Sequence, residues 1–143
     1  NGKTVCGKNI SDREWKIRIP GTVTSPLGIF SAEIFLYEGQ KIEEKKYTKW
    51  FDYDKIKKCP MIRTRQTGDY LTIADGRGGM IRKSLKSYFV DQKIPREERD
   101  RLPILAEDDH VLWVMGYRIS EYYKVTENTK RILKVQLIRK EFA

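Results

Sequence analysis

Three separate segments in which every second residue is apolar constrain the fold more than any other feature of this chain. The first precedes Pro20-Gly21, the second follows the turn Pro26-Leu27-Gly28, and the third lies near the C-terminus. The alternating positions are Trp15, Ile17 and Ile19; Phe30, Ala32, Ile34 and Leu36; and Leu133, Val135 and Leu137. Because successive side chains of a strand point to opposite faces, each segment predicts a strand with one buried face.

Residues 83–93 change to helical spacing, which predicts a short helix. Pro95 suits the first position of a second helix, which we expect to run to Arg101 and to end at Pro103. On the wheel of the first helix, one face carries Leu85, Tyr88, Phe89 and Gln92, and another carries Lys83, Lys86 and Lys93. The first helix is therefore expected to pack on a core and to present positive charge.

A hairpin with Trp113 inside is predicted from two apolar segments, Ile104-Leu105 and residues 111–115, which an acidic turn separates. The single histidine, His110, follows the acidic turn and is expected to be solvated. Short antiparallel strands with two or three small helices indicate an α+β fold. The length of 143 residues fits one domain, 1–143, in which 1–50 form a strand-rich lead-in.

Positive charge is concentrated in the middle of the chain. Residues 55–86 hold nine Lys/Arg and two acidic residues, a net charge of +7 out of +9. The flanks are nearly neutral, with nine basic and eight acidic residues over 1–54 and eleven basic and ten acidic over 87–143. A local basic stretch beside aromatic residues is typical of a protein that binds a polyanion, most often nucleic acid.

Basic residues without acidic neighbours in sequence are the candidates for RNA contact. We expect ion pairs within the second helix, between Glu97 and Arg101 and between Arg96 and Asp100, to occupy the arginines there. The predicted RNA-binding residues are Arg63, Arg65, Arg77, Arg82, Lys83, Lys86 and Lys93. A solvated basic face is the alternative interpretation of the same residues.

The sequence offers little for catalysis, so no catalytic residue and no metal site are predicted. The run Gly76–Ser84 ends in Lys-Ser, but a phosphate-binding loop needs glycine where Arg82 stands, before Lys83. The loop glycines can still let the backbone approach an RNA phosphate. One histidine excludes a histidine-rich metal site, and the carboxylates form no convincing acid–base pair.

The remaining features predict a cytoplasmic protein. Cys6 and Cys59 lack a companion pattern and are expected to be free thiols. The first residues carry no signal-peptide pattern, and no apolar run is long enough to cross a bilayer.

Several segments between residues 51 and 134 match a known family in order and with compatible gaps. They are 51–56, 63–69, 83–103, 112–121, 123–126 and 129–130. They include Ile94-Pro95-Arg96-Glu97-Glu98-Arg99-Asp100 and Leu112-Trp113-Val114-Met115-Gly116-Tyr117-Arg118-Ile119-Ser120. Through these segments, residues 51–134 resemble the C-terminal domain of the bacterial tRNA(Ile)-lysidine synthase family. One departure lies at Gly79-Met80-Ile81-Arg82, where family members often carry a glycine-plus-lysine run.

The resemblance implies the tRNA-binding part of a ligase that joins lysine to the wobble cytidine of tRNA(Ile). ATP with magnesium, and lysine, would be used by a catalytic N-terminal domain whose Ser-Gly-Gly-x-Asp-Ser loop these residues lack. This domain would bind the acceptor stem. The resemblance also implies a compact α+β fold of antiparallel strands in a sandwich-like arrangement with two or three short helices, related to a domain of the phenylalanyl-tRNA synthetase β chain. The rival hypothesis is a protein-interaction or dimerisation module, a homodimer included, that uses the basic surface.

Overall fold

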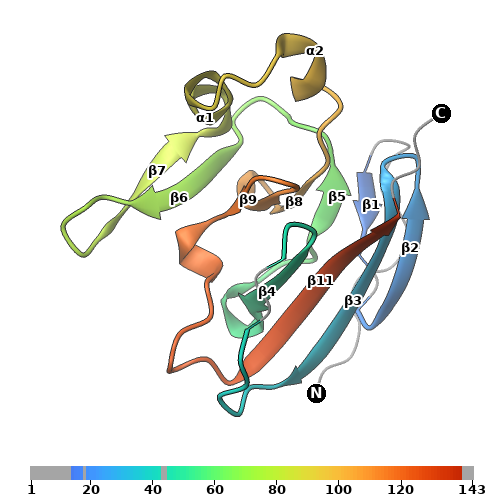
Figure 1. The fold of residues 1–143 in the computed structure, drawn as a ribbon, viewed down its shortest axis with the longest axis vertical. Helices are drawn as coiled ribbons and strands as arrows, with labels where there is room; N and C mark the ends of the chain where they lie inside the picture. Colours follow the sequence, from blue (N-terminus) through green and yellow to red (C-terminus); the bar gives the residue numbers. More distant parts are fainter. Residues whose placement is uncertain (1–13, 18, 43–44, 140–143) are drawn as a thin grey trace.

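A computed structural model describes residues 14–17, 19–42 and 45–139, and it has three layers: a small sheet, a larger sheet and two short helices (Figure 1). Over these residues the larger sheet has seven strands. Its order is β1 (Glu14–Lys16), β5 (Met61–Arg63), β8 (Ile104–Glu107), β9 (His110–Val114), β6 (Tyr70–Ala74) and β7 (Met80–Ser84), with β10 (Arg118–Ile119) beside β9. Neighbours are antiparallel except β6 and β9, which are parallel.

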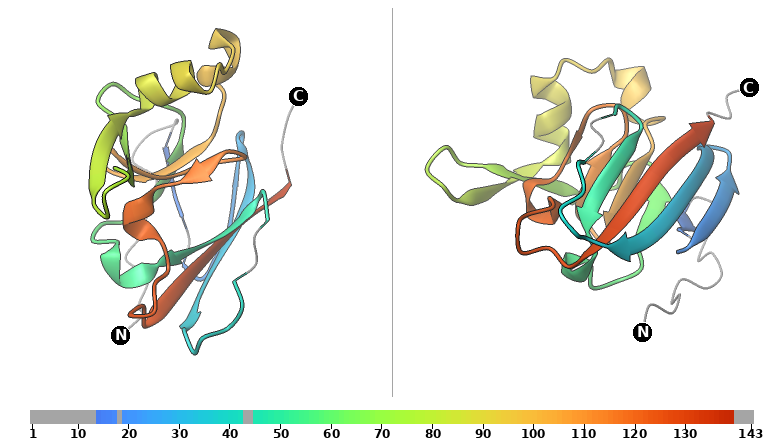
Figure 2. Two further views of the ribbon diagram at one scale, coloured as in Figure 1. Left: turned by 60° about the vertical axis from the view of Figure 1, so that its left-hand side comes forward. Right: turned by 60° about the horizontal axis from the view of Figure 1, so that its bottom comes forward.

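The smaller sheet has four strands among the described residues and lies against one face of the larger sheet (Figure 2). Its order is β2 (Gly21–Ser25), β3 (Gly28–Leu36), β11 (Arg131–Arg139) and β4 (Thr48–Asp52). The central pair aligns Val135 of β11 with Ala32 of β3. Two strands far apart in the sequence, β3 and β11, therefore form the middle of this sheet.

The main core fills the space between the two sheets. Phe30, Phe51 and Leu133 from the small sheet meet Trp113 and Tyr123 from the other side, and all five are fully buried. The predicted alternation in β3 and β11 is confirmed, because Phe30, Ala32, Val135 and Leu137 belong to this core. The alternation fails at the end of β3, where Leu36 is 64% exposed.

A second core lies between the larger sheet and helix α1 (Leu85–Asp91). Leu85, Tyr88 and Phe89 are buried there, as the helical spacing predicts. The hydroxyl of Ser84 accepts a hydrogen bond from the Ser87 N–H at 3.0 Å and caps the helix. The helix is shorter than its pattern suggests.

The predicted lysine face of this helix is wrong for that reason. Lys83 lies in strand β7, and Lys93 follows the helix with a left-handed φ of 56°. Only Lys86 lies on α1 itself. The register of β7 with β6 holds Lys83 in the strand, since Lys83 pairs with Leu71.

The remaining elements include one predicted hairpin and several that the sequence patterns missed. The β8–β9 hairpin with Trp113 inside is confirmed. The second helix, α2 (Arg96–Arg99), is short, and two 3-10 turns, η1 (Tyr53–Lys55) and η2 (Glu121–Tyr123), were not predicted. Strand β2 and the β6–β7 hairpin were also missed, because polar residues and glycines interrupt their apolar alternation.

Cys59 is disulfide-bonded, so the prediction of a free thiol is wrong at this position. Cys6 lies outside the described residues. Among the helices of the described chain, none combines the length and the apolar composition that crossing a membrane requires. The α+β fold predicted from the residue patterns is confirmed, and so is the sandwich-like arrangement that the resemblance implies.

Candidate nucleic-acid interface

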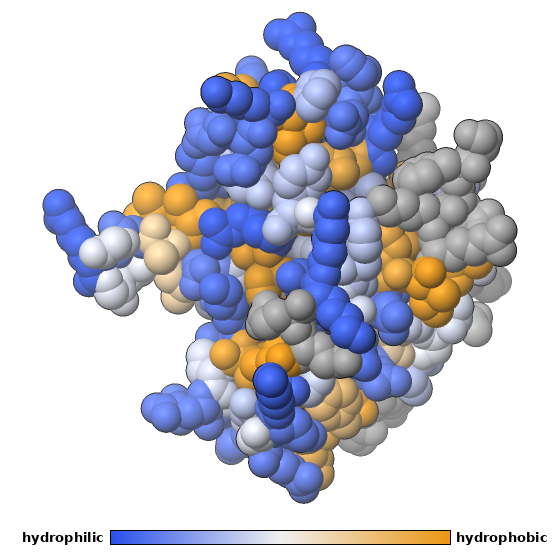
Figure 3. Space-filling view, in the orientation of Figure 1, coloured by the Kyte–Doolittle hydropathy of each residue, from blue (hydrophilic) through white to orange (hydrophobic). Residues whose placement is uncertain are grey.

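The surface is hollowed beneath the β6–β7 hairpin, where a cavity of about 550 Å³ opens to solvent (Figure 3). Elements far apart in sequence form its walls: the hairpin, the turn between β8 and β9, and the segments around η1 and η2. We call this cavity the hollow. Its lining residues are Lys55, Lys57, Lys58, Tyr70, Thr72, Met80, Ile81, Arg82, Glu107, Asp108, Asp109, His110, Tyr122 and Tyr123.

Four ring side chains, Tyr70, His110, Tyr122 and Tyr123, contact one another in the wall of the hollow, and we call them the aromatic cluster. The rings of Tyr70 and His110 stack, with centroids 4.5 Å apart and an interplanar angle of 21°. The His110 ring lies 5.4 Å from that of Tyr122 and 4.8 Å from that of Tyr123. The cluster is therefore built around His110.

The prediction of a solvated His110 is wrong. The parallel pairing of β6 with β9 places His110 beside Tyr70, and a ring nitrogen of His110 lies 2.7 Å from the Thr72 hydroxyl. Burial lowers the pKa of His110 below its usual value, although the carboxylates of Glu107 and Asp109 act in the opposite direction. The neutral imidazole is therefore favoured in the folded protein.

Cations lie over two rings of the aromatic cluster. The guanidinium of Arg82 stands 4.2 Å from the centroid of Tyr70, and the amine of Lys55 stands 5.4 Å from that of Tyr122. Both distances suit cation–π attraction. Arg82 reaches this face because it pairs across the hairpin with Thr72, which places both side chains on the same side of the sheet.

Carboxylates also line the hollow, and one of them organises its wall. The Glu107 carboxylate accepts hydrogen bonds from the backbone N–H groups of Lys57 and Lys58 at 2.8 and 2.9 Å, and it accepts another from the Tyr123 hydroxyl. Burial, and then this hydrogen bond, raise the pKa of Tyr123 far above its usual value. Within the described ranges, no group of three or more metal-ligating side chains is placed to hold a metal ion.

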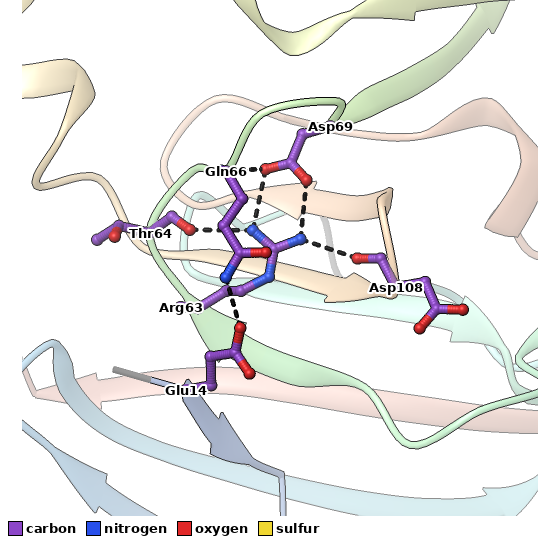
Figure 4. Close-up of polar contacts among 6 residues, drawn as sticks. All are labelled: Glu14, Arg63, Thr64, Gln66, Asp69 and Asp108. Carbon is purple, nitrogen blue, oxygen red and sulfur yellow. Dashed lines mark hydrogen bonds and ion pairs between the residues drawn. The ribbon is translucent and has the colours of Figure 1, made fainter. Parts of the chain in front are cut away.

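Arg63, predicted to contact RNA, is buried instead, with 3% of its side chain exposed (Figure 4). Its guanidinium donates two hydrogen bonds to the Asp69 carboxylate at 2.8 and 2.9 Å and others to the carbonyls of Thr64 and Asp108. The expectation that Arg63 lacks an acidic partner is therefore wrong. A guanidinium satisfied in this way inside the protein has no face left for a phosphate.

Arg65 and Lys83 are also paired. Arg65 donates to Asp100 at 2.8 Å and lies over the Phe89 ring, while Lys83 forms an ion pair with Asp91 of α1. The predicted pair of Arg96 with Asp100 does not form among the described residues, because Asp100 contacts Arg65. Both pairs are partly exposed, so they bind their cations weakly.

Arg77 lies in the tip of the β6–β7 hairpin, and its side chain is exposed. The exposed carboxylate of Asp75 accepts hydrogen bonds from the backbone N–H groups of Arg77 and Gly79 at 2.7 and 3.0 Å. These hydrogen bonds lower the pKa of Asp75. Because Asp75 already takes these donors, the loop backbone is poorly suited to cradle a phosphate. The positive φ of Gly76 and Gly78, 82° and 87°, explains the glycines.

The other four predicted cations are exposed and form no ion pair with any residue in the described part of the chain. They are Arg77, Arg82, Lys86 and Lys93. They do not lie on one face. Arg82 faces the hollow, whereas α1, which carries Lys86, packs on the opposite side of the larger sheet. The seven predicted residues thus divide into one buried, two paired and four unpaired cations.

Sequence reasoning missed Lys55, Tyr70 and Tyr122 as site residues. Lys55 was counted in the basic segment but not singled out, and Tyr70 and Tyr122 carry no local signal of their position. Only the parallel contact of β6 with β9, a long-range pairing, brings Tyr70 to His110. The expectation that one of Tyr122 and Tyr123 faces outward is confirmed, since Tyr123 is fully buried and Tyr122 is half-buried.

The two packed sheets and the short helices define an α+β domain, and comparisons with known proteins name its family. The family model described as "TilS substrate C-terminal domain" matches residues 61–137. A crystal structure of the TilS C-terminal domain superposes with a TM-score of 0.66 and 28% identity, covering 87% of this chain and 96% of that one. The chain therefore belongs to the TilS C-terminal domain family.

The names of individual curated relatives agree with this family. The tRNA(Ile)-lysidine synthase of Caldanaerobacter subterraneus subsp. tengcongensis is 39% identical over 122 residues, 84% of this chain and 26% of that protein. The tRNA(Ile)-lysidine synthase of Clostridium tetani is 43% identical over 91 residues, 64% of this chain and 19% of that protein. The chain thus spans about a quarter or less of the length of these relatives.

Proposed function

We propose that this chain is the tRNA-binding C-terminal part of a tRNA(Ile)-lysidine synthase. The complete enzyme would be a cytoplasmic ligase that joins lysine to the wobble cytidine of tRNA(Ile) and uses ATP with magnesium in a catalytic N-terminal domain. The membership of the family and the names of the relatives support this proposal. The 143 residues contain no Ser-Gly-Gly-x-Asp-Ser loop, so we assign them no catalytic step.

The single observation that carries RNA binding is a set of exposed cations that form no ion pair with the described residues. Arg63 would have to leave its ion pair with Asp69 before it could contact a phosphate. No such ion pair has to break for the four exposed cations, Arg77, Arg82, Lys86 and Lys93. Double-stranded RNA is recognised largely through phosphates, 2′-hydroxyls and shape, which requires such cations on a rigid support. We therefore propose that these cations contact the acceptor stem from both faces of the larger sheet, and that Arg63 does not take part.

A salt series on a blunt-ended acceptor-stem duplex tests this proposal. Counterion release makes log affinity fall linearly with log salt, by about 0.9 per neutralised phosphate for B-form duplex DNA. Replacing Arg77, Lys86 and Lys93 together by Gln is expected to weaken binding and to flatten that slope by up to about 3. The control, Lys41→Gln with Lys130→Gln, removes two exposed cations elsewhere on the described chain and should leave the slope nearly unchanged.

Equal slopes for the two sets of variants would overturn the assignment of RNA contact to Arg77, Lys86 and Lys93. Thermal melting of every variant must show a folded protein, because only then does the slope report the lost contacts. No affinity for the duplex in the unmodified chain, at low salt, would reject RNA binding by this domain.

A protein-interaction module remains the second candidate because one observation favours it. Met80 and Ile81 lie in β7, the edge strand of the larger sheet, and each is 51% exposed. An unpaired edge with apolar side chains is suited to pairing with a second chain. A molar mass of twice 16.9 kDa in solution without RNA would support this candidate, and a monomer that binds the duplex would reject it.

A further inference from the structure

Part of the aromatic cluster faces solvent, so packing of the core alone does not explain it. Tyr70 and Tyr122 are half-buried at the hollow, while Tyr123 beneath them is fully buried. The rings of Tyr122 and Tyr123 meet edge to face at 5.0 Å and 87°. The hollow thus has an aromatic wall that a planar ligand can reach.

Hydrogen bonds hold this wall in place before any ligand arrives. Thr72 positions the His110 ring, and the buried Ser120 hydroxyl accepts the Thr72 N–H at 3.0 Å. On the other side, Glu107 fixes the hydroxyl of Tyr123. A rigid aromatic wall loses little conformational entropy on binding, so it favours affinity.

The charges around the wall distinguish a nucleobase from a bare phosphate. Arg82 and Lys55 lie over the two half-buried rings of the aromatic cluster, and both have long side chains that can turn toward a phosphate. Asp109 also lines the hollow, and its exposed carboxylate forms no side-chain hydrogen bond or ion pair with the described residues. A carboxylate repels a phosphate but accepts hydrogen bonds from the amino and imino groups of a base.

We propose that the hollow takes one unpaired nucleobase of an RNA next to a duplex. The base stacks on Tyr122, displacing the Lys55 amine toward the flanking phosphate, and Arg82 engages the phosphate on the other side. The volume of about 550 Å³ lies in the range of small-ligand pockets. This inference rests on the proposed function, because it requires that the domain bind RNA.

The test compares two RNAs with the same duplex, one blunt-ended and one with an unpaired 3′ overhang that carries 2-aminopurine. Stacking of one base on an aromatic side chain is worth about 1–3 kcal/mol. We therefore expect the overhang to tighten binding by about 10-fold, the factor that corresponds to 1.4 kcal/mol, and the fluorescence of 2-aminopurine to change on binding.

Variants of Tyr122 assign the effect to the hollow. Tyr122→Leu is expected to remove the advantage of the overhang and the fluorescence change, whereas Tyr122→Phe keeps both because it keeps the ring. The matched control is Tyr117→Leu, which changes a tyrosine that is 42% exposed and lies outside the hollow. Retention of the overhang advantage in Tyr122→Leu would overturn the proposal.

The two RNAs separate failure of this inference from failure of the proposed function. Equal affinity of the unmodified chain for both RNAs, with salt-sensitive binding, would overturn the pocket and leave duplex recognition standing. No affinity for either RNA would overturn both.

Discussion

Arg63 and Arg82 come from the same basic segment of the sequence, yet the structure uses them in opposite ways. Arg63 is 3% exposed, and the Asp69 carboxylate and two backbone carbonyls satisfy its guanidinium. Arg82 is exposed on the edge strand, where its guanidinium lies over the Tyr70 ring and forms no ion pair with the described residues. The first arginine joins the β5, β6 and β8–β9 segments, and the second faces outward.

The difference shows that local charge density does not identify a binding surface by itself. The basic segment contains two acidic residues, and both have structural partners: Asp69 pairs with Arg63, and Asp75 closes the β6–β7 hairpin. Other cations of the segment pair with acids from outside it, as Arg65 does with Asp100. The charge available to a polyanion is therefore smaller than the net charge of +7 suggests.

The largest expected effect comes from breaking the buried pair. Arg63→Met leaves the Asp69 carboxylate buried without its cation, and such a loss costs about 3–5 kcal/mol of unfolding free energy. Urea denaturation followed by circular dichroism measures it. The double variant Arg63→Met with Asp69→Asn removes both charges and should recover part of the loss. A midpoint equal to that of the unmodified chain would show that Arg63 is not structural.

A second effect concerns the pH dependence of stability at the hollow. The pKa of His110 is lowered by burial, so between that value and about 6.5 the unfolded chain binds more protons than the folded one. Stability is therefore fully present above pH 6.5 and falls as the pH drops toward the folded pKa, by at most about 1.4 kcal/mol per pH unit.

His110→Gln isolates this contribution, because Gln does not titrate while the neighbouring Glu107 and Asp109 stay in place. Denaturation at pH 7.5, 6.5 and 5.5 should give a flatter dependence for the variant than for the unmodified chain. Identical dependences would contradict the assignment to His110.

A smaller effect is expected for the contact that holds Arg82. A double-mutant cycle with Tyr70→Leu and Arg82→Gln should give a coupling free energy of about 0.5–1 kcal/mol, the value of an exposed cation–π contact. Unfolding free energies of the four proteins provide the cycle. Coupling as large as that of a buried ion pair would remove the contrast between Arg63 and Arg82.

The smallest effect on stability is expected for an unpaired cation. Lys86 is exposed on α1 without an ion pair among the described residues, so Lys86→Gln should change the unfolding free energy by less than about 0.5 kcal/mol. The same denaturation measurement checks it. A loss above about 1 kcal/mol would place Lys86 among the structural residues with Arg63.

The sequence alone determined the elements whose signal is local. The alternation in β3 and β11, the spacing of Leu85, Tyr88 and Phe89, and the β8–β9 hairpin were all predicted and all occur. These patterns are readable because burial of one face repeats with the period of the strand or the helix. The motifs along residues 51–134 also identified the family.

Only the tertiary structure decided which cations are free and where a ligand can enter. The hollow combines side chains from β6, β7, β9, η1 and η2, and the parallel contact of Tyr70 with His110 has no mark in the sequence around either residue. Lys83 likewise lies in a strand rather than on the helix because its pairing with Leu71 fixes it there. Pairing and burial are set by contacts between distant segments, so they become defined only when the chain has folded.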